Sequence, residues 1–253
     1  MKYHYIMIFE HVSKSYTTSW AKYIRMEKGT AAPLDRHESL ITLESISAPM
    51  FLRQFKENAM ANMSYIVAEA GPGKGVVIDP TAEYGRILHT IETEGLKIEY
   101  ILNTHSHPDH TFGNRRLAAE TGARIAAHRL ANMKKDLALD DGAVLQVGAL
   151  EIKVLHTPGH SRDGLCFLAD HKLFTGDTLF VGECGRTDIP GGDAGAMYDS
   201  LFGKLLKLPD GTEIYPGHDY GPRPTSTLGT ERRTNYTLEP RTREEFIEFM
   251  AEP

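Results

Sequence analysis

The stretch that decides the fold is THSHPDH, residues 104–110, which places three histidines, an aspartate and a proline in seven positions. It overlaps the end of LKIEYILNT (96–104), whose pattern predicts a β-strand. In extended chain, alternate side chains point the same way, so His105 and His107 can face one point. The aspartate and the third histidine follow at the expected start of a helix. The motif therefore offers four metal ligands at the end of one strand.

More candidate ligands recur downstream, each beside a glycine where a β-rich segment ends. His160 lies in TPGHS, Asp177 in FTGDTLF and His218 in YPGHDY. A neighbouring glycine lets the backbone turn sharply and bring a side chain to a crowded centre. The candidate ligands in chain order are His105, His107, Asp109, His110, His160, Asp177 and His218. Imidazole and carboxylate without cysteine suit Zn, Fe or Mn rather than a cysteine-rich structural zinc site.

Each of these residues has an ordinary structural role open to it when it is taken alone. Asp109 fits the N-cap of a helix, His218 fits a surface loop, and His156 fits the core or a supporting position beside the ligands. The joint pattern of HxHxDH, GH, GD and GH in this order, with β-rich spacers, favours a metal site.

The periodicity along the chain predicts a layered α+β arrangement. The first half is predicted to hold strands at 63–70, 75–79, 96–104 and 123–128 and helices at 81–95 and 112–122. The second half reads as short strands, a helix at about 195–207 and a terminal helix at 243–250. Two sheets packed on one another with helices outside would bury these apolar faces.

Length and composition fit one domain of about residues 49–253 after an N-terminal extension, residues 1–48, of unknown role. The extension could pack on the domain, cover the pocket or form a homodimer. A net charge of −6, with no dense Lys/Arg tract, argues against nucleic-acid binding. No apolar run reaches the roughly 18–20 residues of a membrane span. Two cysteines, Cys166 and Cys184, and no targeting signal make a cytoplasmic location the expectation.

THSHPDH, followed by His160, Asp177 and His218, resembles the metallo-β-lactamase superfamily over about residues 50–225. The resemblance implies an αββα four-layer sandwich with the metal at one edge, between the two sheets. Three local features are similar to the persulfide dioxygenases of that superfamily. They are ECGRTD (183–188), PGHDYG (216–221) and the short tail of 35 residues after His218.

The persulfide dioxygenase resemblance implies one Fe²⁺ per chain, held by His105, His160 and Asp177. It leaves the other motif residues as supports or as ligands of a second metal, namely His107, Asp109, His110 and His218. It places Arg186 and Tyr220 at the substrate pocket, with Asp109 orienting the ligands. The implied reaction uses O₂ to oxidise the terminal sulfur of a thiol persulfide, by family default glutathione persulfide, to sulfite and thiol.

Two other interpretations stay open from the residues. Glyoxalase II, a hydroxyacylglutathione hydrolase, shares the same elements but uses all seven side chains to hold two Zn²⁺ ions or a mixed Zn/Fe pair, with Asp177 bridging. It carries a longer helical C-terminal region than this chain has room for. A metal-stabilised scaffold without activity is the third. Arg186 could instead pair with Asp188, and Tyr220 could serve packing alone.

Overall fold

The computed structural model describes residues 6–7, 23–24 and 50–252. The chain divides into two compact units, residues 1–45 and 46–253. In the first unit, strands β1 (Ile6–Met7) and β2 (Tyr23–Ile24) pair in antiparallel register. The roles proposed for residues 1–48 otherwise lie outside the described residues.

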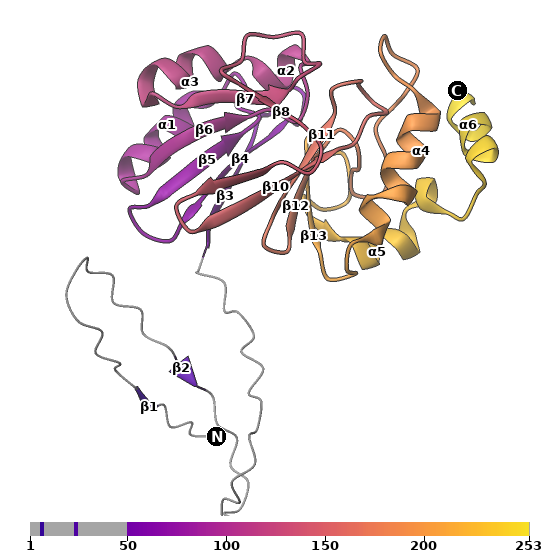
Figure 1. Cartoon of the computed structure of the whole chain (residues 1–253). Helices are drawn as coiled ribbons and strands as arrows, with labels where there is room; N and C mark the ends of the chain where they lie inside the picture. Colours follow the sequence, from indigo (N-terminus) through magenta and orange to yellow (C-terminus); the bar gives the residue numbers. More distant parts are fainter. Residues whose placement is uncertain (1–5, 8–22, 25–49, 253) are drawn as a thin grey trace, which may run out of the picture. The chain divides into compact units, whose positions relative to one another are not determined.

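The second unit is built around two six-stranded sheets (Figure 1). The first sheet contains, in spatial order, β3 (Met50–Lys56), β4 (Met63–Glu69), β5 (Lys74–Ile78), β6 (Lys97–Leu102), β7 (Arg124–His128) and β8 (Leu137–Leu139). The second contains β14 (Ser226–Thr227), β13 (Glu213–Pro216), β12 (Lys172–Gly176), β11 (Leu165–Ala169), β10 (Leu150–His156) and β9 (Val144–Val147). Both sheets mix parallel and antiparallel pairs.

Helices cover the outer faces of the two sheets. The helices of the unit are α1 (Tyr84–Thr93), α2 (Pro108–Thr111), α3 (Asn114–Thr121), α4 (Ala194–Gly203), α5 (Leu228–Thr234) and α6 (Arg243–Ala251), with 3₁₀ turns η1 (Leu205–Lys207) and η2 (Tyr236–Leu238). Figure 1 shows α1 and α3 against the first sheet and α4 and α6 beyond the second. The order of layers is therefore helix, sheet, sheet, helix, as the sequence predicted.

Alternation along the strands explains why both faces of each sheet are covered. In β4, Ile66 packs against the α1–α3 side, whereas Val67 packs into the core between the sheets. In β11, Cys166 faces the α4–α6 side and Phe167 faces the central core. Successive strand side chains point to opposite faces, so a strand with no polar face must be buried on both sides.

Most predicted elements are confirmed within a few residues. The predicted helix at 112–122 begins later, at Asn114, because the Gly113 N–H donates to the Pro80 carbonyl (2.9 Å) instead of extending the short α2. Strand β3 and helix α5 were not predicted, because MFLRQFK and LGTERRT carry weak periodicity. Within the described ranges, none of the helices is long and apolar enough to cross a membrane.

Candidate metal centre

The candidate ligands lie where strands of both sheets end. His105 follows β6 and Asp177 follows β12, while His160 and His218 follow β10 and β13. At Gly217 the two sheets come so close that an added Cβ would collide with Asp177 Oδ1 and lie 2.9 Å from His110 Cε1. All seven side chains predicted from the sequence are therefore brought to one sheet edge.

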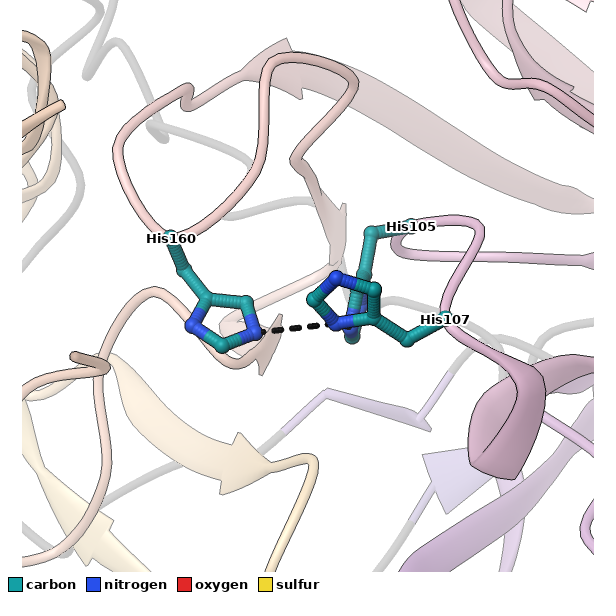
Figure 2. A group of neighbouring side chains, drawn as sticks. All are labelled: His105, His107 and His160. Carbon is teal, nitrogen blue, oxygen red and sulfur yellow. Dashed lines mark hydrogen bonds between the residues drawn. The ribbon is translucent and has the colours of Figure 1, made fainter. Parts of the chain in front are cut away.

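Three imidazoles form one group of possible ligands, the first triad, consisting of His105, His107 and His160. His107 Nδ1 lies 2.9 Å from His105 Nε2 and 3.1 Å from His160 Nε2. Figure 2 shows the three rings turned toward one another, with His160 reaching in from the opposite loop. The expectation that His105 and His107 face one point is met by this geometry.

A second group, the second triad, consists of Asp109, His110 and His218. His110 Nε2 and His218 Nε2 are 3.2 Å apart, and each lies 3.5 Å from Asp109 Oδ2. His110 and His218 are buried, whereas Asp109 is partly exposed. Three of the four residues assigned to supporting or second-metal roles thus converge on a point of their own, whereas the fourth, His107, lies in the first triad.

Asp177 stands between the two triads. Its Oδ2 lies 3.5 Å from His160 Nε2 and 3.4 Å from His218 Nε2, and its Oδ1 lies 3.4 Å from His110 Nε2. One carboxylate therefore faces nitrogens of both groups.

The donor set fits a metal ion. Two ligand atoms held about 2.0–2.1 Å from a tetrahedral ion lie about 3.3–3.4 Å apart, close to the separations in both triads. Asp177 Oδ1 is buried, and its contact with His110 Nε2 is long at 3.4 Å. A buried acceptor so weakly compensated is unfavourable, and a cation would satisfy it.

The nitrogen that points away from the centre is held in each of the four Nε2-facing histidines. His160 Nδ1 donates to the Arg186 carbonyl (2.9 Å) and His218 Nδ1 donates to the Met60 carbonyl (3.0 Å). His105 Nδ1 meets the Thr104 hydroxyl (3.1 Å). His110 Nδ1 contacts Asp79 Oδ2 (3.1 Å). Such partners fix the tautomer and the ring orientation that metal binding needs.

The pKa values of four histidines shift, downward for two in the first triad and upward for two in the second. Burial lowers the pKa of His105 and His160, and the neighbouring His110 lowers that of His105 further. Burial also opposes charge on His110 and His218, but the carboxylates around them outweigh it. The pKa of His110 therefore lies well above its usual value, and that of His218 is raised to about 9. His105 and His160 thus favour the neutral imidazole, whereas His110 and His218 favour the charged one.

Asp177 is ionised in this setting. Burial acts to raise the pKa of its carboxyl group, but the charge of His110 and the hydrogen bonds from His110 and His218 hold it well below the usual range. Asp109 behaves alike: burial is opposed by His218, His110 and Asn62, and its pKa is lowered. Both carboxylates are available to bind a cation.

The two residues predicted at a substrate pocket lie beside the centre. Arg186 forms a bidentate pair with Asp188 (2.7 Å for both contacts), the structural alternative considered from the sequence. Its carbonyl, rather than its side chain, contacts His160. The Tyr220 ring stacks on His218 at 4.6 Å and is 54% exposed. Tyr220 therefore borders the centre with a face open to solvent.

The cysteines and His156 make contacts of other kinds. Cys166 is fully buried in the core, as predicted. Cys184 lines a cavity of about 580 Å³ together with Arg186, Tyr236 and Met250, and burial raises its pKa to about 11. His156 stacks on His128 at 4.0 Å and contacts the Arg162 carbonyl (3.0 Å).

Three residues of the site were not predicted from the sequence. Asp79 directly follows β5 and accepts hydrogen bonds from the Thr104 N–H (2.8 Å) and hydroxyl (2.5 Å) while contacting His110. Asn62 donates to Asp109 Oδ2 (2.9 Å). Glu231 is a buried carboxylate of α5. The sequence signal for Asp79 was its place directly after the apolar strand GVVI. Asn62 and Glu231 had no comparable signal in the sequence.

The family description "Metallo-beta-lactamase superfamily" matches residues 59–135 and 131–218. The chain is 36% identical over 211 residues to the human persulfide dioxygenase ETHE1, mitochondrial, covering 81% of this chain and 82% of that protein. It is 39% identical over 170 residues to a hydroxyacylglutathione hydrolase of Polaromonas sp., covering 64% of each. The crystal structure of ETHE1 from Myxococcus xanthus superimposes with a TM-score of 0.76 and 34% identity, covering 81% of this chain and 92% of that one.

Proposed function

The chain belongs to the metallo-beta-lactamase superfamily, and we propose that within it the protein is a persulfide dioxygenase. The observation that carries the proposal is the convergence of His105, His160 and Asp177 in a chain similar over most of its length to a human persulfide dioxygenase. We further propose that a low-molecular-weight thiol persulfide, with glutathione as the carrier, is the substrate, and that the enzyme acts in the cytoplasm.

Two imidazoles and one carboxylate are the residues that would hold one Fe²⁺ per chain. Iron bound in this way leaves open positions for O₂ and for an anionic sulfur, and supplies the redox chemistry that O₂ needs. The overall reaction balances as R–S–S⁻ + O₂ + H₂O giving R–SH, sulfite and a proton. The ionised Asp177 carboxylate would be the one anionic ligand of this ion and would lower the net charge of the centre.

The surrounding residues orient the ligands and the substrate. The Arg186 carbonyl fixes His160 with Nε2 toward the centre. The Arg186 guanidinium, now paired with Asp188, is exposed and suited to bind a carboxylate of the carrier thiol. Tyr220 offers a hydroxyl beside His218. Asp109 contacts His110 and His218 and so orients both imidazoles at the centre.

A dinuclear hydrolase is the second candidate, and one observation favours it. Asp109, His110 and His218 are spaced like ligands of a second ion, with Asp177 facing both triads. Two metal ions held by these residues would supply an activated water for hydrolysis of a thioester. The similarity to a hydroxyacylglutathione hydrolase supports the same alternative.

Metal counting and O₂ uptake separate the two functions. The protein, purified without added metal, should contain about one iron per chain and should consume O₂ when glutathione persulfide is added. Sulfite should appear in a 1:1 ratio with O₂ consumed, as the balanced reaction requires. Two metal ions per chain, with thioester hydrolysis and no O₂ uptake, would overturn the proposal.

A variant at the second triad tests the same point from another side. His218→Ala removes one possible second-metal ligand and leaves the first triad intact. In a mononuclear dioxygenase the iron content should stay near that of the unaltered protein. A hydrolase with two ions should instead lose one of them, which elemental analysis detects directly.

A further inference from the structure

Helix α5 contributes a buried carboxylate that holds a loop of the metal centre. Glu231 is 1% exposed, and its Oε2 accepts hydrogen bonds from the Gly182 N–H (2.7 Å) and Asn235 Nδ2 (3.0 Å). Asn235 Nδ2 also donates to the Glu183 carbonyl (3.3 Å). The 179–186 loop is therefore held near its middle by an ionisable side chain and its amide neighbour.

The two ends of the 179–186 loop reach different triads. Toward its start, the Phe180 ring lies 5.9 Å from the His218 ring and 5.3 Å from that of Tyr220. At its end, the Arg186 carbonyl accepts the His160 Nδ1 hydrogen bond (2.9 Å). A displacement of the middle of the loop would thus move contacts of both triads together.

Burial of a carboxylate is unfavourable unless donors compensate it, so an apolar residue would be the better choice if α5 only needed to pack. Hydrogen bonds to an ionised acceptor are roughly twice as strong as neutral ones. Gly182 has a positive φ of +91°, so its N–H is presented by a backbone shape that other residues rarely adopt. The carboxylate of Glu231 and the backbone conformation at Gly182 are thus matched at one hydrogen bond.

We propose that Glu231 is a positioning residue of the metal centre. By fixing Gly182 directly and Glu183 through Asn235, it sets where Phe180 meets His218 and where the Arg186 carbonyl meets His160. Glu231 acts through the loop and touches neither metal nor substrate. The inference rests on the proposed function only in requiring a bound metal, and it holds equally for one ion or two.

The first experiment replaces the carboxylate with its closest neutral analogue in the Co²⁺-loaded full chain. In Glu231→Gln, the amide oxygen can still accept from both donors, but it is a weaker acceptor than a carboxylate oxygen, so the anchoring of the loop weakens. We expect an altered visible spectrum of the bound Co²⁺ and removal of Co²⁺ by a chelator about 10-fold faster, the size of effect typical of residues that orient ligands. Glu244→Gln, an exposed glutamate of α6, is the matched control and should change neither.

A second pair of variants moves the loop from its other side. Gly182→Ala and Gly122→Ala both place a Cβ where the positive φ (+91° and +74°) is strained and where no atom lies within 4 Å. They therefore impose similar strain, the first in the loop and the second at the end of α3. Only Gly182→Ala should alter the Co²⁺ spectrum and the rate of metal loss.

Two results would overturn the inference. One is a folded Glu231→Gln protein with the Co²⁺ spectrum and chelation rate of the unaltered chain, because Glu231 would then only stabilise the fold. If Glu231→Gln does not fold, equal behaviour of Gly182→Ala and Gly122→Ala would have the same meaning. Failure of the unaltered protein to consume O₂ would instead reject the proposed reaction and leave this inference standing.

Discussion

The two triads of the metal centre are similar in spacing and differ in charge. The first is made of three imidazoles, and burial keeps the pKa of His105 and His160 low. The second contains Asp109 and is backed by Asp79, and its imidazoles have raised pKa values. A cation binds neutral imidazole, so it competes with protons more at His110 and His218 than at His105 and His160. The two triads are thus alike in geometry and differ in charge.

The largest expected effect comes from the residue that joins the triads. Asp177→Asn keeps the size of the side chain and removes the charge that both groups share. We expect metal content close to zero and activity reduced by on the order of 10²–10³-fold, as when a major electrostatic partner is lost. Elemental analysis measures the metal content, and O₂ uptake measures the activity. Asp140→Asn, at an exposed ion pair, is the control; a normal metal content in Asp177→Asn would reject the shared role.

His107→Ala tests the composition of the first triad. If iron is held by His105, His160 and Asp177, the variant should retain about one iron and bind it some 10–100-fold more weakly, because a supporting side chain is lost. His107 Nδ1 lies 2.9 Å from His105 Nε2, close enough for both atoms to bind one metal ion. If the His107→Ala protein is isolated without iron, His107 is therefore a ligand. Titration with Fe²⁺ under anaerobic conditions supplies the affinity.

Asp79→Asn should weaken the second triad more than the first. His110 Nδ1 would lose the carboxylate it contacts, and a hydrogen bond to the Thr104 N–H would become neutral. We expect the free energy of unfolding to fall by about 1–3 kcal/mol, the range for a disturbed buried hydrogen-bonded group. Thermal denaturation with and without metal measures the change. If a variant near the first triad that keeps all its ligands lost more metal affinity than Asp79→Asn does, the expected difference between the two triads would be contradicted.

Asn62→Ala should have the smallest effect. It removes the donor to Asp109 Oδ2, but it also removes the buried Oδ1 that has no hydrogen bond among the described residues. The two changes oppose one another, so we expect a net destabilisation of no more than about 1 kcal/mol. Chemical denaturation detects a shift of this size. A loss of several times this value would show that Oδ1 binds a water or ion of the centre.

The periodicity of the chain was enough to predict the layered fold, since β4, β6 and β7 and helices α1 and α6 lie within a few residues of the predicted segments. Strand β3 was missed because Arg53 and Gln54 interrupt its apolar pattern. The start of α3 was placed too early because the hydrogen bond between Gly113 and Pro80 links segments distant in sequence. Errors therefore fell where the local pattern is weak or where a long-range contact outweighs local preference.

The sequence by itself determined which side chains could meet a metal, because His105, His160, Asp177 and His218 each stand next to a strand end and a turn-forming residue. Tertiary structure alone decided how they are grouped. His110 meets Asp79 across 31 positions and His218 across 108, and Glu231 reaches Gly182 across 49. No local pattern encodes such contacts, since they arise only when two sheets and their helices pack and bring remote strand ends to one edge.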